Sequence, residues 1–446
     1  MATRRAASAV AGDRVRPELI AAESREEGAG GSLRARLAGP ALGFSLNGFF
    51  VYLGALAAVG IEPRTALTGA YYGLLGVALL ALAWPGRRRI AARIDAGGRT
   101  AAVFAASAAL LAAWFLASAA LLSDGTAPSR RFAAQLLFWT VPSVLLALSL
   151  NQRQLVGALW TVAGLGLLFV LVDVVTLLVP SGEDLGDRFS PIPDLDPITA
   201  AQIPALGAVA LVCLSLRDGR LAAGRLAALF VLAAFAVIPG SRGPLAALAV
   251  GSVAVVGLAW RRTGPLVIAA LVLGAAAGAL IATEVGSERH LTSELSSSGS
   301  GDTAPISSLN IRKQLLEKAV RAVPDAPLLG NGVGTLVDDT PEARRMGIAG
   351  RATYPHNNFV EAIYSLGAFG LALYAAAVAA AAWALVQVAR RARDALAVFG
   401  VAFFAFAFVS SNMSGELGAD AWLWTAAALG VALLGTRRRR EAVEAP

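Results

Sequence analysis

Repeated apolar runs are the feature of this sequence that most restricts its fold. Twelve can be drawn, at 41–60, 65–84, 100–122, 132–150, 155–179, 198–216, 226–240, 244–260, 266–283, 359–389, 395–412 and 422–435. About 20 apolar residues in a helix cross the hydrocarbon core of a bilayer, and a helix satisfies its backbone polar groups internally. The sequence therefore predicts an all-α, polytopic integral membrane protein with about 12 transmembrane helices and a long external loop between helices 9 and 10.

The charge distribution gives the expected orientation. The net charge of +8 invites a nucleic-acid function, but the positions of the arginines argue against it. With the N-terminus inside, the cytoplasmic segments hold 25 arginines, whereas the short external loops hold five. This is the positive-inside pattern. Both termini are thus predicted to be cytoplasmic, with membrane lipids and no nucleic acid among the partners.

The runs divide the chain into segments. We expect a disordered cytoplasmic tail at 1–40, transmembrane helices 1–9 over 41–283, an external loop subdomain at 284–358, helices 10–12 over 359–435, and a cytoplasmic tail at 436–446. Within the loop, "SSLNIRKQLLEKAVRAVP" predicts an amphipathic helix that Pro324 ends. Its cap is Ser307 or Ser308, and its apolar stripe is Ile311, Leu315, Leu316 and Val320.

Polar residues near the external side are the candidate functional residues, because such groups are costly inside a membrane. Arg242 lies in "IPGSRGPLAALAV", where Gly and Pro interrupt two apolar runs. It is either a functional cation or an arginine that reaches from a turn to the interface. Arg312 on the loop helix and Arg188 in the fifth-to-sixth loop are binding candidates or solvated charges. Asp173 is a further candidate, with a helix-packing hydrogen bond as the alternative.

His356 is one of two histidines in the chain and stands directly before Asn357 and Asn358. A neutral imidazole at the external mouth of the tenth helix can accept a proton from a hydroxyl, and a helix cap is the alternative. Glu361, one turn later, either orients His356 or helps cap the helix. The segment "LLGNGVGTLVDD" reads as a glycine turn, because it lacks the strand and Lys-Ser/Thr of a phosphate loop. No metal-ligand spacing is present, so no metal is expected.

At these residues the sequence resembles the O-antigen ligase and polymerase family of membrane glycosyltransferases. Three stretches carry the resemblance: "SRGPLAAL" at 241–248, "IRKQLLEKAVRAVPDAPLLGNGVG" at 311–334 and "HNNFVEAIYSLGAFG" at 356–370. Family members usually carry Glu two residues before the first of the two spaced glycines, Gly367 and Gly370, and here that residue is Ser365. Glu361 is the candidate substitute for that carboxylate.

The resemblance implies a function in the bacterial cytoplasmic (inner) membrane, with the active site on the external or periplasmic face. A glycan would pass from a polyprenyl (undecaprenyl) diphosphate carrier to an acceptor hydroxyl on a glycan, lipid or protein, with inversion. Arg242 and Arg312, with Arg188, would bind the diphosphate, since arginine forks match phosphate oxygens. His356 would be the base, and Asn357 or Asn358 would hold the imidazole or the acceptor. Neither a metal nor another cofactor is expected.

Other functions stay open. A polysaccharide polymerase would use the same donor and a growing lipid-linked chain as acceptor. A secondary transporter of a small solute also suits 12 helices and a broken-helix polar site, but the chain lacks a repeat of broken helices. A non-catalytic scaffold for envelope assembly would leave His356 and Arg242 without a role.

Overall fold

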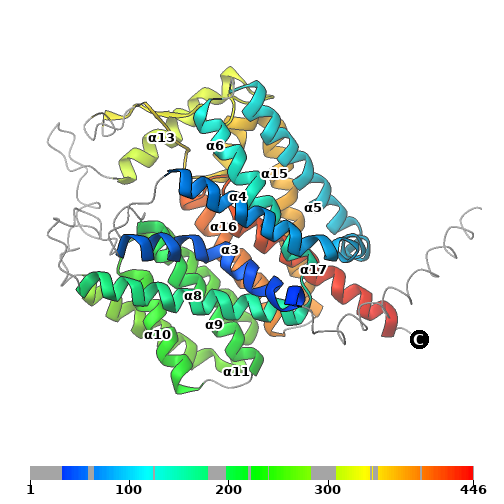
Figure 1. Cartoon of the computed structure of the whole chain (residues 1–446), viewed down its shortest axis with the longest axis vertical. Coiled ribbons are helices and arrows are strands. Elements are labelled where there is room, and N and C mark those ends of the chain that lie inside the picture. Colours follow the sequence, from blue (N-terminus) through cyan, green and yellow to red (C-terminus); the bar gives the residue numbers. More distant parts are fainter. Residues whose placement is uncertain are drawn as a thin grey trace, which may run out of the picture.

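The computed structural model describes residues 33–58, 65–123, 126–178, 197–218, 222–239, 241–282, 308–341, 344, 350–391 and 394–444. Thirteen α-helices make up most of this part of the chain (Figure 1). They are α3 (Leu33–Ala58), α4 (Thr65–Ala83), α5 (Arg87–Leu121), α6 (Ala127–Gln135), α7 (Val141–Ser149), α8 (Gln152–Leu178), α9 (Pro197–Asp218), α10 (Ala223–Val237), α11 (Arg242–Ala282), α13 (Ser308–Ala322), α15 (Asn358–Arg391), α16 (Ala395–Ser414) and α17 (Ala421–Glu444).

Short elements connect or extend several of these helices. Turns of 3₁₀-helix cover η1 (Trp84–Gly86) and η4 (Val323–Asp325), and η2 (Leu136–Thr140) is a π-helix that joins α6 to α7. The strands β1 (Val337–Asp338) and β2 (Arg351–Ala352) form an antiparallel pair, with Val337 opposite Ala352. The prediction of a helical protein is therefore confirmed, with this two-residue pair as a small addition in the loop.

The membrane character of the helices is confirmed. Among the described residues, six segments are long and apolar enough to cross a membrane: Tyr71–Leu121, Ala127–Ser149, Gln152–Val175, Ile198–Asp218, Asn358–Arg391 and Ala395–Ser414. Shorter apolar helices cover Ala223–Val237, Arg242–Val255 and Pro265–Ile281. Because lipid solvates their outer faces, several helices expose large apolar side chains, such as Leu74, Leu121 and Val253.

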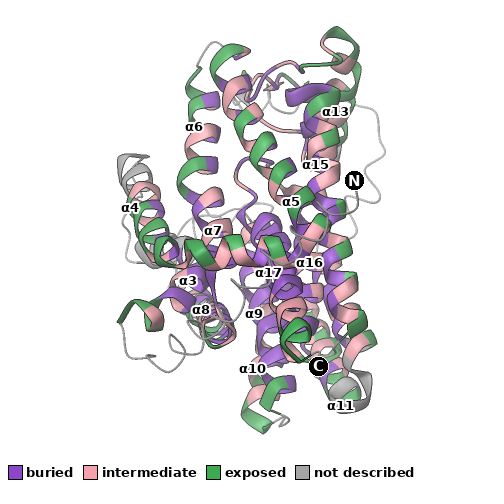
Figure 2. Ribbon diagram, turned by 90° about the vertical axis from the view of Figure 1, so that its right-hand side faces the viewer, coloured by how far each residue is buried: buried purple, intermediate pink, exposed green. Residues whose placement is uncertain are grey.

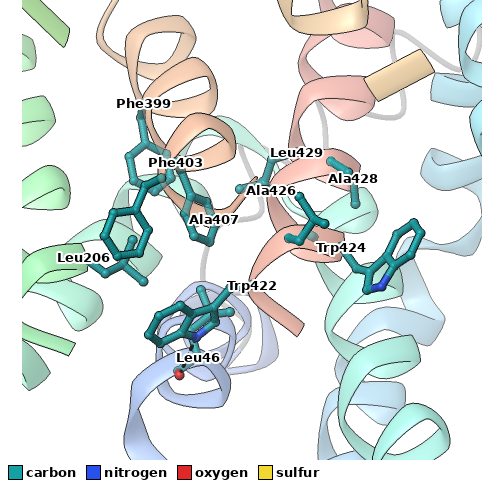
Figure 3. Packing of buried hydrophobic residues seen from close by; sticks show 14 of the residues in the cluster. Leu46, Leu206, Phe399, Phe403, Ala407, Trp422, Trp424, Ala426, Ala428 and Leu429 are labelled. Carbon is teal, nitrogen blue, oxygen red and sulfur yellow. Dashed lines mark hydrogen bonds between the residues drawn. The ribbon is translucent and has the colours of Figure 1, made fainter. Parts of the chain in front are cut away.

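Helix α17 lies at the centre of the bundle. Its residues from Ala421 to Gly435 are all buried, and Figure 2 shows α16 and α9 to be largely buried beside it. Trp422 and Trp424 point to opposite sides of α17 (Figure 3). The Trp422 indole donates to the Leu46 carbonyl at 2.9 Å, which satisfies a polar group inside an apolar core. A helix with apolar side chains all round is expected in such a core.

Arginines gather at one end of the bundle, where they bind carbonyl groups and carboxylates. Arg93 donates to the Leu148 carbonyl at 2.6 Å, and Arg89 donates to the Ser149 carbonyl at 2.7 Å. These carbonyls belong to the last turn of α7 and have no partner within the helix. Arg438 donates to the Gly97 carbonyl at 2.9 Å, so the C-terminal arginines lie at the same end. Helix α13 lies on the other side of the molecule (Figure 1).

Two segments differ from the predicted tails. Helix α3 begins at Leu33, inside the segment 1–40 that was expected to be disordered. Helix α17 continues to Glu444, through the arginine run that was expected to form a cytoplasmic tail. Two ion pairs tie this last part of α17 to the segment between α15 and α16: Arg437 contacts Asp394 at 2.6 Å, and Glu441 contacts Arg391 at 2.7 Å.

Helix α11 contains a reversal of direction that corresponds to the boundary between the predicted runs 244–260 and 266–283. A Cβ on Gly243 would lie 3.2 Å from Ser414 Oγ, and one on Gly251 would lie 3.3 Å from the Ala402 carbonyl. The first half is thus antiparallel to α16. Glycines of the second half, Gly274 and Gly278, approach Phe230 and Ala234 in the same order along α10. A straight helix would place Gly274 about 48 Å from Arg242, too far to reach Phe230, which lies only 12 residues before Arg242 in the chain, so the two halves form a hairpin.

Helix α15 also reverses, and this corrects the prediction of one span over 359–389. Gly367 has φ 69° and ψ −171°, which interrupts the helix. The rings of Phe359 and Tyr374 are 5.0 Å apart, although 15 residues of straight helix would separate them by about 22 Å. Residues 358–366, here called the arm, therefore fold back along the spanning residues 368–391. The start of the arm lies inside the bundle instead of at its mouth.

The loop helix α13 packs on the arm. Leu315 and Ala319 are buried, and Ala319 clusters with Leu336 of the loop and with Tyr364 of the arm. The predicted helix is confirmed, but the predicted stripe is partly wrong, because Val320 is 52 % exposed and Ala319 takes its place. The position i+4 from Leu315 is Ala319, so the narrower stripe follows the helical period.

Candidate active site

The segment before the arm holds His356 and Asn357 in a defined conformation. Asn357 Oδ1 accepts hydrogen bonds from the Phe359 and Val360 backbone N–H groups, both at 3.1 Å, and thereby caps the arm. His356 has φ 55°, the one positive φ outside glycine among the described residues. Its ring lies 4.5 Å from the ring of Tyr354. A left-handed non-glycine residue carries a conformational cost that is found most often at functional sites.

Two predicted site residues bind the C-terminal end of α16, and the segment of a third packs against it. Asn357 Nδ2 donates to the Asn412 carbonyl at 3.3 Å, and Arg312 Nη1 donates to the Met413 carbonyl at 3.1 Å. Arg242 adjoins Gly243, which packs against Met413 and Ser414. The last carbonyls of a helix lack internal partners and carry partial negative charge, so they attract these donors. Residues far apart in sequence thus surround one helix end.

Asn358 and Glu361 face the segment 415–420, which joins α16 to α17 and is here called the α16–α17 turn. Asn358 Nδ2 donates to Asp420 Oδ2 at 2.7 Å, and Glu361 Oε2 accepts from the Leu417 backbone N–H at 3.0 Å. Both side chains are buried, with 0 % and 4 % exposure. These contacts favour a positioning role over direct contact with substrate. Glu361 was expected to orient His356 or to help cap the helix. Its hydrogen bond goes to Leu417 instead, and Asn357 provides the cap.

The α16–α17 turn carries two carboxyl groups that sequence reasoning missed. Burial raises the pKa of Glu416 to about 7, although the nearby Arg131 partly opposes the shift. Burial also raises the pKa of Asp420 to about 6, and Asp420 caps α17 through the Leu423 backbone N–H at 3.1 Å. A carboxyl group taken out of water favours its neutral form. The sequence signal was "SGELGAD", a short polar interruption between two apolar runs.

The glycine turn at 327–334 closes over the reversal of α15. The Asn331 backbone N–H donates to the Tyr364 carbonyl at 2.7 Å, and the Ala368 N–H donates to the Pro327 carbonyl at 2.8 Å. A Cβ on Gly330 would lie 2.5 Å from the backbone nitrogen of Gly367. The two glycines let two backbones touch, so the turn is structural. This agrees with its interpretation as a glycine turn.

Two further candidates from the sequence are Arg188 and Asp173. Arg188 lies outside the described residues. Asp173 is 1 % exposed in α8, and neither carboxylate oxygen has a hydrogen-bond partner among the described residues. The predicted helix-packing hydrogen bond is therefore not observed in that part of the chain. Within the described residues, no three His, Cys, Asp or Glu side chains are grouped to hold a metal ion.

Comparison with known families matches a segment that contains part of this cluster. Residues 227–375 match the family model described as O-antigen ligase. This segment is similar to O-antigen ligases. The predicted resemblance to this family is therefore confirmed. No curated protein matches the chain.

The matched segment runs from α10 into the spanning part of α15. It contains Arg242, Arg312, His356 and the arm, whereas the α16–α17 turn lies outside the matched residues. The apolar helices are those of a membrane protein, and the matched segment is similar to O-antigen ligases. The contacts of the arm with the α16–α17 turn join the matched segment to a part of the bundle outside the family match.

Proposed function

We propose that the chain is an inverting glycosyltransferase that moves a glycan from a polyprenyl diphosphate carrier to an acceptor hydroxyl on the external face of the membrane. The observation that carries this proposal is the convergence of Arg312, Asn357 and the segment of Arg242 at the end of α16, directly beside His356. Two guanidinium groups and one imidazole suit a diphosphate leaving group and a hydroxyl nucleophile.

The proposed reaction is a single displacement. The acceptor oxygen forms the new bond to the anomeric carbon, and the bond from that carbon to the phosphate oxygen breaks. Its electron pair leaves with the polyprenyl diphosphate, whose charge Arg242 and Arg312 stabilise. The hydroxyl proton passes to the imidazole of His356. Attack from the face opposite the leaving group inverts the anomeric carbon.

The external location follows from charge. The arginine-rich end of the bundle, with Arg93 and Arg438, lies apart from the site, and positive charge favours the cytoplasmic side. This charge distribution supports a site on the opposite face. Bacterial inner-membrane localisation and cytoplasmic termini are part of the same proposal.

Ligase and polymerase share the donor and differ in the acceptor, so the proposal takes the ligase reaction with the polymerase as its alternative. A secondary transporter is less well supported, because backbone contacts with the glycine turn lock the arm in place at Gly367.

The test uses purified protein and a polyprenyl-diphosphate-linked oligosaccharide, with envelope extract as the acceptor source. We expect release of free polyprenyl diphosphate that needs both the extract and His356. His356→Ala should lose about 10²–10⁴-fold in turnover, the usual contribution of a general base. His290→Ala, which removes the other histidine, is the matched control. Full activity of His356→Ala would disprove the base assignment.

The two arginines are tested by lysine substitution. Arg312→Lys and Arg242→Lys keep the charge and lose the planar fork, so turnover should fall. Arg321→Lys is the control, because Arg321 lies on the same helix as Arg312 with its side chain 80 % exposed. Normal turnover in the first two variants would mean that charge alone is sufficient.

A further inference from the structure

An apolar cavity lies between α5 and the η2–α7 segment. It has a volume of about 260 Å³, and its lining runs along α5 from Phe104 to Phe115 and along α7 as far as Leu148. The two phenylalanines are 11 residues apart on a helix, which corresponds to about 16 Å. One leaflet of a bilayer contributes about 15 Å of hydrocarbon, half the thickness of the core. The cavity therefore has the length of a lipid chain in one leaflet.

The lining is almost entirely hydrocarbon. Of the described residues that form it, only Thr140 and Trp424 have a polar group in the side chain. The Thr140 hydroxyl donates to the Gly418 carbonyl at 2.9 Å, and the Trp424 indole donates to the Leu417 carbonyl at 3.4 Å. Both donors are used within the protein, so the lining offers little to a polar ligand. A hydrocarbon chain fits it better than a sugar or a polar solute does.

The cavity opens on the lipid-facing side of α5. Ala109 lies in its lining and is exposed, and the neighbouring Leu110 is 54 % exposed. This part of α5 belongs to a segment that is long and apolar enough to cross a membrane. A lipid chain can thus enter sideways from the bilayer without passing through water.

Residues 87–97 close the cavity at the arginine-rich end of the bundle. Gly98 has φ 60° and ψ −148°, which interrupts α5, so these residues do not continue the line of its spanning part. Arg93 of this segment binds a carbonyl in the last turn of α7 at 2.6 Å, and Ile90 and Ile94 line the cavity. One end of the cavity therefore lies at the interfacial level of the arginines.

A cation lies at this end of the cavity. Arg87 precedes Ile90 and Ile94 by three and seven residues, the spacing that places residues on one face of a helix. Arg87 is exposed, and its guanidinium lies 4.8 Å from the ring centroid of Trp84, which is itself 68 % exposed. Arg88 is exposed as well. Basic pockets between membrane helices suit anionic lipid head groups, so positive charge here complements a phosphate.

We propose that the cavity binds one acyl chain of an anionic phospholipid and that Arg87 binds its phosphate. The lipid belongs to the leaflet at the arginine-rich end, which is the cytoplasmic leaflet in the orientation proposed above. The position of the cation favours this occupant over the polyprenyl chain of a donor, whose diphosphate is assigned to the end of α16, apart from these arginines. The site is separate from the proposed reaction and does not depend on it.

Photolabelling in a bilayer tests the site directly. The probe is phosphatidylglycerol with a diazirine midway along one acyl chain, and the full-length protein is held in nanodiscs of phosphatidylcholine. We expect labelling of α5 near Ala108 and of α7 near Val144, the two walls of the cavity. Unlabelled phosphatidylglycerol should displace the probe at a mole fraction about fivefold lower than phosphatidylethanolamine, the ratio expected from one arginine at an anionic head group.

Ala108→Phe places a bulky side chain in the cavity, and Ala106→Phe is its matched control on the exposed face of the same helix. The first variant should reduce labelling of α7 by at least about tenfold, and the control should be labelled as wild type is. Arg87→Gln should lose the advantage of phosphatidylglycerol. Arg390→Gln should keep it, although Arg390 also lies over an exposed tryptophan, 5.7 Å from the ring of Trp383. Because Arg87 is exposed, this pair tests the site even if Ala108→Phe fails to fold.

Four results would overturn the proposal. They are absence of labelling on the two walls, labelling of α7 that Ala108→Phe leaves unchanged, equal displacement by phosphatidylglycerol and phosphatidylethanolamine, and an Arg87→Gln variant that keeps the wild-type preference. A further arm uses polyprenyl diphosphate as the competitor. We expect it to displace the probe less effectively than phosphatidylglycerol, and equal or stronger displacement would assign the cavity to the chain of the donor instead.

Discussion

Replacing Gly367 with alanine should release the loop from the arm. Gly367 has φ 69° and ψ −171°, a region that side-chain-bearing residues rarely adopt. An added Cβ would lie 2.2 Å from the Leu328 carbonyl oxygen and 2.6 Å from the Gly330 backbone nitrogen. Both are backbone atoms of the glycine turn, so they cannot move aside as the end of a flexible side chain would. The turn as a whole must shift.

The expected cost has two parts. The backbone conformation costs about 1–3 kcal/mol for a residue other than glycine. Overpacking adds about 1–3 kcal/mol. The turn is held by backbone bonds such as Asn331 N–H to Tyr364 at 2.7 Å and Ala368 N–H to Pro327 at 2.8 Å, each worth about 1 kcal/mol. A total near 4 kcal/mol corresponds to a shift of about 10³-fold toward the undocked loop.

Limited proteolysis with a protease of broad specificity measures this population, because cleavage follows the fraction of open chain. Gly367→Ala should be cleaved rapidly in the turn at 327–334 and should lose transferase activity. Gly350→Ala is the control, since Gly350 has φ 84° but no heavy atom within 4 Å of the added Cβ. If Gly367→Ala resists the protease as well as Gly350→Ala does and keeps the wild-type Tm, the backbone lock is refuted.

Three further predictions concern single side chains. His356→Gly should be inactive yet about 1 kcal/mol more stable than His356→Ala, because glycine accepts φ 55° without cost; equal Tm values would contradict the backbone conformation. The raised pKa of Glu416, about 7, means that the native state keeps a proton that the unfolded state loses near pH 4.5, so this group's contribution to stability falls as pH rises from about 4.5 to 7. Glu416→Gln should remove on the order of 3 kcal/mol of that pH dependence. If the Tm values of wild type and Glu416→Gln change in parallel from pH 5 to 8, the raised pKa of Glu416 is refuted. Lys318→Met breaks a contact of 2.7 Å to Asp339 between half-exposed side chains, so the free energy of unfolding should fall by less than about 1 kcal/mol, with a correspondingly small change in Tm. The low pKa of Asp339 should rise toward its usual range in an NMR titration of this variant.

The sequence predicted the helices well because apolar runs are a local property. Each of the twelve runs lies largely on helix in the described part of the chain, and the loop helix ends beside Pro324 as expected. His356, Arg242 and Arg312 could be selected because charged and titratable residues are rare among apolar runs.

The reversal of α15 was not predicted. Residues 359–389 read as one apolar run, and Gly367 within it looks like an ordinary helical glycine until Leu328 and Gly330 are placed against it. The turn at 415–420 was missed for a similar reason. Glu361 and Leu417 are 56 residues apart, and Asn358 and Asp420 are 62 residues apart, so no local pattern connects them.

The sequence by itself determined that the chain is a helical membrane protein, which end of the bundle collects the arginines, and which rare polar residues were candidates for chemistry. These follow from hydrophobicity and charge, which act residue by residue. Only the tertiary structure decided that the arm folds back into the bundle and that Asn357 and Arg312 meet at the end of α16. The same holds for the burial of Glu416 beside an apolar cavity. Such contacts depend on how helices pack, and packing is set by the shapes of surfaces that are distant in sequence.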